Sequence, residues 1–297
     1  MEQVEEYEKL EREVIGATNM PTVKKQTRRK RPAAKGKGVA GRIKPVGLSG
    51  GVKLLAYGRG KTGKTRLAST FPKKVLIIGT EDGTRSVSNV KGVDFVQLER
   101  SSELDECVEL LEEGKYASAC LDHAGGLQDL IIKEHLGMEE IPKAKFGSDA
   151  RSWGLVKSAD WGPINAQVKK RIHTLLSLAK SHNLNIVIIA HERTFNSDSE
   201  SDLIFPTVGA ALTPGVVGWL NGTVEYICQT FIREETKQVK VTAKTTRQQP
   251  TGKAEYCLRI GPHPVFMTGF RVPVGVEIPD VVVDPSYSKI RKYVEGG

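Results

Sequence analysis

The sequence predicts an α/β fold in which helices cover both faces of a mostly parallel sheet. Apolar runs such as residues 75–78 and 186–190 lack the polar alternation of half-exposed strands, which is typical of strands buried on both faces. These runs alternate with longer segments of helical periodicity, and this succession favours parallel strands joined by helices. After about residue 223 the pattern becomes strand-rich without helices, which predicts antiparallel strands appended to the parallel core.

The individual elements begin at residue 52, where the first short apolar run starts. Strands are predicted at 52–57, 74–78, 95–98, 117–121 and 185–190, and helices at 64–70, 102–113, 127–135 and 164–182. Segment 192–214 shows no clear element and is predicted to be a long loop. Later strands are predicted at 224–232, 238–245 and 256–260.

The chain of 297 residues has a net charge of +9, most of which comes from one segment. Residues 24–44 hold ten Lys and Arg and no acidic residue, whereas residues 1–13 hold six Glu against two basic residues. A segment with so little apolar surface cannot offset the entropy cost of ordering itself. We therefore expect residues 1–50 to form a flexible, acidic then basic arm, residues 51–268 a core, and residues 269–297 a C-terminal extension.

Several classes of protein are excluded by the composition. No apolar run approaches the roughly 18 residues of a membrane-spanning helix. The first residues, MEQVEEYEKL, lack the apolar segment of a secretory signal, so we expect a cytoplasmic location. The four cysteines are far apart and form no CxxC pair, so we expect reduced, mostly buried thiols.

Residues 58–65, GRGKTGKT, match the pattern GxxxxGK[ST] between a predicted strand and a predicted helix. In this context backbone N–H groups and the helix N-terminus surround the phosphates of ATP or GTP. Lys64 is expected to contact the β- and γ-phosphates, and the Thr65 hydroxyl to bind Mg²⁺. The predicted nucleotide-binding residues of this segment are Gly58, Arg59, Gly60, Lys61, Thr62, Gly63, Lys64, Thr65 and Arg66.

Polar residues at three predicted strand ends are candidates for the chemistry. Asp122 ends a weakly apolar strand, the pattern of a carboxylate that holds Mg²⁺ through water. Because Asp122 is followed by His and not by Glu, a second acid must come from elsewhere; Glu81, beyond the strand at 74–78, is positioned to activate water. The alternative is that Glu81 lies in an ordinary acidic turn. His191 is a candidate γ-phosphate sensor, or else an ordinary surface histidine.

Four features follow one another in this order: YGRGKTGKT, a strand followed by Glu81, then Asp122, and then IVIIAHE. With these features the sequence resembles the RecA-like ATPases, most closely the phage RecA-like single-strand-annealing family of the AAA_24-type group. The resemblance implies an ATPase that uses Mg²⁺, with Glu81 as the catalytic residue and His191 in place of the usual Gln. It also implies single-stranded DNA binding, annealing or recombination, and a ring or filament of identical subunits. In such assemblies Lys244 and Arg247 would reach the neighbour's nucleotide; the alternative is that they belong to a solvated strand end.

Three segments are candidates for contact with DNA. The resemblance assigns this role to 192–214, where Phe195 is positioned to stack on a base. Segment 137–162 interleaves basic residues with Trp153 and Trp161, which also suits packing. The basic arm fits either nucleic-acid binding or a localisation signal. Two other functions stay open: a P-loop kinase acting on a small molecule, and a DNA-binding adaptor that only retains nucleotide.

Overall fold

The computed structural model describes residues 50–138, 156–196, 206–240 and 246–294. The chain divides into two units, Met1–Gly47 and Leu48–Gly297, and every described residue belongs to the second. The predicted arm therefore lies outside the described residues, apart from residue 50.

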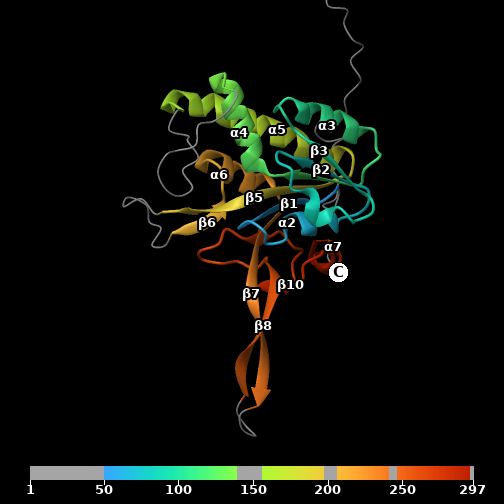
Figure 1. Cartoon of the computed structure of the whole chain (residues 1–297), viewed down its shortest axis with the longest axis vertical. Coiled ribbons are helices and arrows are strands. Elements are labelled where there is room, and N and C mark those ends of the chain that lie inside the picture. Colours follow the sequence, from blue (N-terminus) through green and yellow to red (C-terminus); the bar gives the residue numbers. More distant parts are fainter. Residues whose placement is uncertain (1–49, 139–155, 197–205, 241–245, 295–297) are drawn as a thin grey trace, which may run out of the picture. The chain divides into compact units, whose positions relative to one another are not determined.

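The described residues form a ten-stranded sheet whose central strands are parallel, which confirms the predicted fold class (Figure 1). Along the sheet the order is β10-β8-β7-β1-β5-β4-β2-β3, with β6 paired to β5 and β9 to β7. The parallel strands are β1 (Lys53–Gly58), β2 (Val75–Gly79), β3 (Val93–Gln97), β4 (Ser118–Asp122), β5 (Asn185–Phe195) and β7 (Tyr226–Lys240). The antiparallel strands are β6 (Thr207–Ala210), β8 (Thr246–Arg259), β9 (Gly269–Phe270) and β10 (Val281–Val283).

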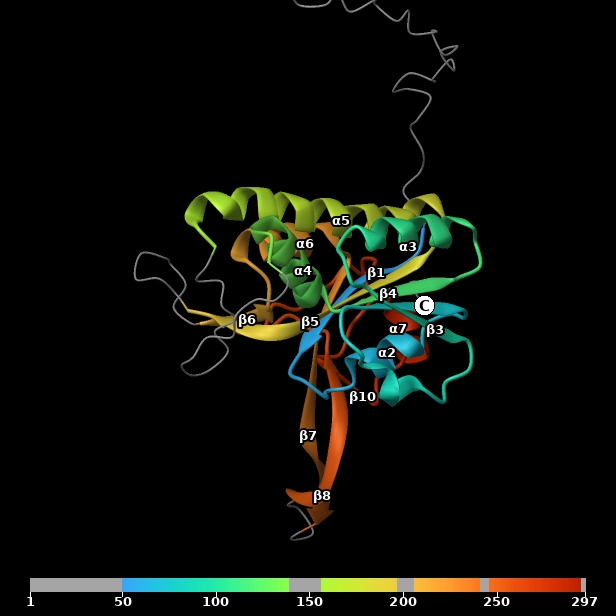
Figure 2. The same ribbon diagram turned by 45° about the horizontal axis from the view of Figure 1, so that its top comes forward.

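Helices pack on both faces of this sheet (Figure 2). One face is covered by α3 (Glu103–Glu112), α4 (Ala124–Leu136), α5 (Trp161–Ser181) and α6 (Pro214–Thr223), and the other by α2 (Lys64–Ser69) and α7 (Tyr287–Val294). Short 3₁₀ turns, η2 (Thr84–Val87) and η4 (Ser158–Asp160), connect other elements. Leu55 and Tyr57 of β1 enter the first core, while Leu54 and Ala56 enter the second. Because these strands are buried on both faces, their sequences are unbroken apolar runs.

Strand β5 lies between β1 and β4 and pairs in parallel with both. Its residue His191 is in register with Gly58, where the phosphate loop starts, and Ile189 with Asp122. On the other side of β4, Gly79 of β2 is in register with Asp122. The carboxyl ends of β1, β5, β4 and β2 therefore lie together along one edge of the sheet, where ligands bind in α/β proteins.

The structure differs from the predictions in several elements. Strand β7 pairs in parallel with β1, so it belongs to the parallel core and continues through the gap left at 233–237. The predicted loop at 192–214 is wrong in part, because β5 runs on to Phe195 and pairs with β6. The expectation of no helix after residue 223 is also wrong, since α7 packs on the sheet through Ile290 and Val294.

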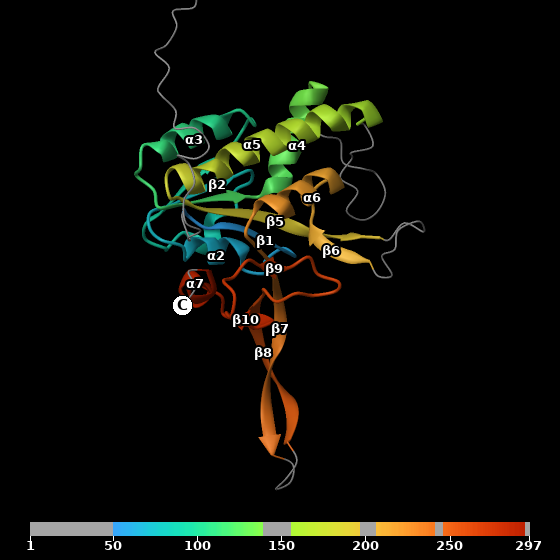
Figure 3. The same ribbon diagram turned by 180° about the vertical axis from the view of Figure 1, so that it is seen from behind.

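The hairpin of β7 and β8 extends beyond the rest of the sheet (Figure 3). Its pairing shifts between Glu234 and Thr236, and beyond that point Val239 pairs with Arg247. Nine residues separate Thr230, beside Gly58, from Val239, which is about 30 Å at the usual rise of a strand. Most side chains of the distal part are exposed, so this ribbon lacks a core of its own.

Two further expectations can be compared with the described residues. All four cysteines are free and buried, as predicted. Within the described ranges, no helix combines the length and the apolar character needed to cross a membrane.

Candidate nucleotide-binding site

The phosphate loop joins β1 to α2 in a conformation that depends on glycine at two places. Gly63, just before α2, has φ 88°, in the left-handed region that favours glycine. At Gly58 a Cβ atom would lie 2.2 Å from the Thr230 carbonyl oxygen of β7. The close approach of β7 therefore requires a residue without a side chain at the start of the loop.

Lys64 is buried beneath this loop, with 8% of its surface exposed. Its ammonium group donates hydrogen bonds to the carbonyl oxygens of Gly58 at 2.9 Å and Arg59 at 2.6 Å. Burial lowers the pKa of Lys64, and the nearby carboxylates of Asp122 and Glu192 act in the opposite direction. A partly desolvated cation that is held by two loop carbonyl groups is suited to bind phosphate oxygens.

The Thr65 hydroxyl on α2 donates a hydrogen bond of 2.6 Å to Oδ2 of Asp122, the last residue of β4. These two oxygen-bearing side chains fit Mg²⁺, which prefers oxygen ligands and usually keeps several waters and substrate phosphates in its shell. Among the described residues no group of three or more His, Cys, Asp or Glu could hold a metal ion. Mg²⁺ held by Thr65 and Asp122 would accordingly need the phosphates of a nucleotide as further ligands.

Glu81, His123 and His191 meet next to this pair. The carboxylate of Glu81 lies 3.6 Å from Nε2 of His123 and is three-quarters exposed, whereas the imidazole is buried. The His123 and His191 rings are in edge-to-face contact, with centroids 4.6 Å apart. Because His191 is in register with Gly58, these contacts connect the end of β2 to the start of the phosphate loop.

Glu192, the residue after His191, accepts a hydrogen bond of 2.8 Å from Nε of Arg59 in the loop. The same carboxylate accepts one of 3.2 Å from the amide of Gln229 on β7. Gln229 in turn accepts from Nε of Arg259 on β8 at 3.2 Å. The loop is thus tied by polar contacts to β5, β7 and β8.

Comparison with known proteins agrees with this geometry. The model of the AAA_24 family, described as an AAA domain, matches residues 50–267, which is most of the chain. The chain belongs to the AAA_24 family. An AAA domain is a nucleotide-binding ATPase domain that usually works with Mg²⁺, and the predicted P-loop ATPase is confirmed at that level. No curated protein matches the chain.

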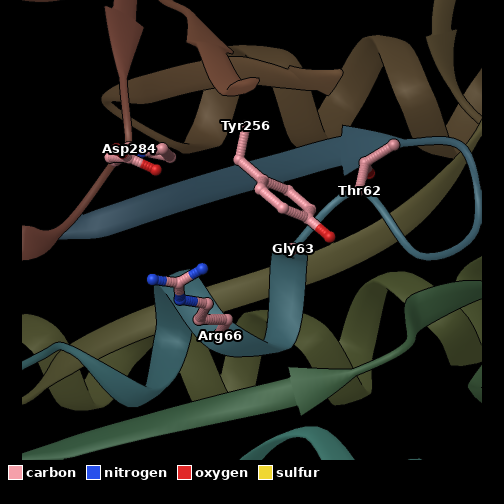
Figure 4. Close-up of a pocket in the computed structure, with 6 residues that line it drawn as sticks. Thr62, Gly63, Arg66, Tyr256 and Asp284 are labelled. Atoms are coloured by element: carbon pink, nitrogen blue, oxygen red, sulfur yellow. The ribbon is translucent and has the colours of Figure 1, made fainter. Parts of the chain in front are cut away.

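A small pocket lies beside the loop of this AAA_24 domain (Figure 4). It is bordered by β8, which lies on the opposite side of β1 from β4, the strand that ends in Asp122. Its lining residues come from the loop, α2, β8 and the turn after β10: Thr62, Gly63, Arg66, Tyr256, Asp284 and Pro285. The Arg66 guanidinium lies 5.9 Å from the centre of the Tyr256 ring. An aromatic ring and a cation at the open side of a phosphate loop offer a stacking surface for a flat ligand.

The structure of the AAA_24 domain brings most of the predicted site together. The loop residues 58–65, Glu81, Asp122 and His191 surround one edge of the sheet, and Arg66 borders the pocket. Arg247 lies on the distal hairpin, far from the loop of its own chain. Lys244, Trp153 and residues 197–205 of the predicted DNA-contacting loop lie outside the described residues.

The two described candidates for stacking on DNA, Phe195 and Trp161, are partly buried. Phe195, near the end of β5, packs against the core beneath Arg193, whose guanidinium is 5.5 Å from the ring centre. Trp161 is the first residue of α5 and also packs against the core. Both rings therefore have a packing role in the described structure.

Sequence reasoning missed four contributors to the site: His123, Glu192, Thr230 and Tyr256. His123 and Glu192 directly follow residues that it did select, so their position at strand ends was an available signal. Thr230 and Tyr256 lie more than 160 residues after the loop. Only the pairing of β7 with β1 and of β8 with β7 brings them to it.

Proposed function

We propose that this AAA_24 protein hydrolyses ATP with Glu81 as the general base, and couples hydrolysis to binding of single-stranded DNA in annealing or recombination of the phage type. The observation that carries the catalytic part is the series of contacts from Glu81 to His123 and from His123 to His191, whose backbone is in register with Gly58. These contacts place the Glu81 carboxylate on the side of the phosphate loop where the γ-phosphate would lie.

Each residue of the proposed site has a defined task in this reaction. Lys64 transfers its hydrogen bonds from the loop carbonyls to phosphate oxygens and offsets the charge that develops during transfer. Thr65 and Asp122 would hold Mg²⁺, which would polarise the phosphate. Glu81 orients the attacking water and accepts its proton, and His191 contacts the γ-phosphate.

The pocket at Tyr256 is proposed to receive the nucleoside. Asp122 and Glu81 lie on β4 and after β2, to one side of β1, whereas Tyr256 lies on β8, to the other side. A nucleotide whose γ-phosphate faces Asp122 therefore extends its base toward Tyr256. Stacking of a base on an aromatic ring contributes about 1–3 kcal/mol, so Tyr256→Leu should weaken ATP binding by about 5- to 150-fold, and Tyr256→Phe should not.

Glu81→Gln tests the catalytic assignment. Gln keeps the size of the side chain but cannot accept a proton, so ATP binding should persist while single-turnover hydrolysis slows by about 10²- to 10⁴-fold. Asp82→Asn, a charge change at the next residue, is the control and should hydrolyse ATP at the wild-type rate. Hydrolysis by Glu81→Gln at that rate would refute the role, and transfer of phosphate to a small molecule in place of water would favour a kinase.

DNA binding is supported by the ten cations of residues 24–44, which match a polyanion in charge. The measurement is ATP turnover of the full chain with and without single-stranded DNA, alongside annealing of complementary strands. We expect stimulation of turnover by DNA. Tight DNA binding with no turnover under any condition would favour the nucleotide-retaining adaptor.

Assembly into a ring or filament is supported by the hairpin of β7 and β8. A two-stranded ribbon alone is marginally stable, and Arg247 lies too far along it to reach its own loop. We propose that Arg247, with Lys244, contacts the neighbour's nucleotide. Arg247→Ala and Lys64→Ala should each be inactive, and mixing them should restore turnover, because some interfaces then pair an intact loop with an intact hairpin. Absence of any restoration in mixed oligomers would contradict this contact.

A further inference from the structure

A buried histidine next to Asp122 is placed to control the catalytic carboxylate. His123 is the residue that precedes α4, and its Nδ1 accepts a hydrogen bond of 2.9 Å from the backbone N–H of Gly126. An imidazole nitrogen that accepts a hydrogen bond carries no proton, so in the neutral ring the proton is on Nε2. Nε2 is the atom that lies 3.6 Å from Oε1 of Glu81.

The two partners differ strongly in freedom of movement. His123 is 6% exposed, and its ring is fixed by the helix cap on one side and by His191 on another. The Glu81 side chain is 75% exposed, and fixing such a chain in one orientation costs rotamer entropy. A rigid donor beside a mobile carboxylate lowers the number of orientations that the carboxylate adopts.

The backbone around the pair is also held closely. The N–H of Thr80 donates to the carbonyl oxygen of Asp122 at 2.9 Å. A Cβ atom at Gly126 would lie only 1.9 Å from the Thr80 hydroxyl, so the first turn of α4 packs directly on the residue before Glu81. The distance between the imidazole and the base of the Glu81 side chain is therefore set by the fold.

We propose that His123 is a positioning residue, which donates its Nε2–H to Glu81 and aims the carboxylate at the attacking water. The inference rests on the proposed function of Glu81. It assigns a task to the residue that occupies the place after Asp122, where a second acid is missing. It also explains why the ring is held by its Nδ1: this bond selects the tautomer whose proton faces Glu81.

Two substitutions separate the two ends of the ring. In His123→Asn the amide oxygen can still cap α4, since Asn is a preferred capping residue, but no donor reaches Glu81. In His123→Gln a donor can reach Glu81, while the cap is weakened. We expect His123→Asn to keep wild-type stability and ATP affinity and to lose about 10- to 100-fold in single-turnover hydrolysis, the effect of misplacing a reacting group. His123→Gln should melt at a lower temperature yet hydrolyse ATP within a few-fold of wild type.

The opposite ranking, in which hydrolysis follows the helix cap, would overturn the proposal. In a Glu81→Gln background His123→Asn should have no further effect on hydrolysis, and an additional loss of the full size would also overturn it. Wild-type hydrolysis by Glu81→Gln alone would refute the catalytic role of Glu81 instead, so the two failures are distinguishable.

A measurement on the wild-type chain does not depend on the folding of a His123 variant. The ¹⁵N shifts of the ring should report Nδ1 without a proton and Nε2 with one, and the Nε2 shift should move in Glu81→Gln. A proton on Nδ1, or an Nε2 shift unaffected by Glu81→Gln, would overturn the proposal.

Discussion

Replacing Lys64 by Ala should abolish nucleotide binding while leaving the fold intact. The ammonium group makes two hydrogen bonds to loop carbonyls, which phosphate oxygens would replace. A hydrogen bond to a charged group contributes about 1.5–3 kcal/mol. Two such bonds give about 3–6 kcal/mol, or roughly 10²- to 10⁴-fold in affinity.

Thermal denaturation with and without MgATP measures this loss. At an ATP concentration of about 100 times the wild-type Kd, binding stabilises the wild type by about 2.7 kcal/mol. For a folded unit of this size that corresponds to a rise in Tm of roughly 5–10 °C. In Lys64→Ala the same ATP concentration should raise Tm by about 1 °C or less, because the affinity is at least 10²-fold lower.

A second lysine provides the control for the lost charge. Lys91 is exposed in the turn before β3, and Lys91→Ala should show the full wild-type shift with MgATP. The unliganded Lys64→Ala protein should melt within a few degrees of wild type, since removal of a poorly solvated cation compensates for the lost hydrogen bonds. A wild-type ATP shift in Lys64→Ala would refute the assignment of this loop.

Three further predictions concern pH, the loop glycines and the arm. Burial lowers the pKa of Lys64 and bound phosphate would raise it, so ATP binding should take up protons at alkaline pH. The affinity for ATP should fall as pH rises through the lowered pKa of Lys64 in the free protein. Equal calorimetric binding enthalpies in buffers of different ionisation enthalpy would contradict this. Gly58→Ala should destabilise the chain by about 1–3 kcal/mol in chemical denaturation, whereas Gly60→Ala, whose Cβ would meet no atom within 4 Å, should have little effect. Removing residues 1–50 should reduce the log–log salt slope of single-stranded DNA binding by up to about 7, since the ten cations of the basic segment 24–44 are lost. An unchanged slope would favour a localisation role for the arm.

The parallel core was predictable because its signals are local. Each buried strand is an apolar run, and the loop motif lies where one such run meets a helix, so residues 58–65 could be placed in their structural context from the sequence alone. Glu81 and His191 were selected because polar residues after parallel strands face the ligand edge. Asp122 was selected because it ends a strand in the pattern of a carboxylate that holds Mg²⁺. The structure places these three residues at the same edge because β2, β4 and β5 are all parallel to β1.

The missed helices have weak local signals. Pro214–Thr223 contains three glycines, which lower helix propensity by about 1 kcal/mol each. It nevertheless forms α6, because Val216, Val217 and Leu220 are buried in the core that α5 shares. In α7 the buried stripe is short, with Ile290 and Val294 as its buried residues. In both helices tertiary packing supplies the stability that the sequence pattern does not indicate.

The contacts that define the site depend on strand order, which apolar periodicity does not encode. If β5 did not lie between β1 and β4, His191 could not face both Gly58 and His123. The same order separates the two ends of a bound nucleotide, with Asp122 on one side of the loop and Tyr256 on the other. A motif search therefore finds the groups that bind phosphate, because these lie on one continuous segment. The groups that would orient water and the base come from β2, β4, β5 and β8, and become neighbours only when the sheet is complete.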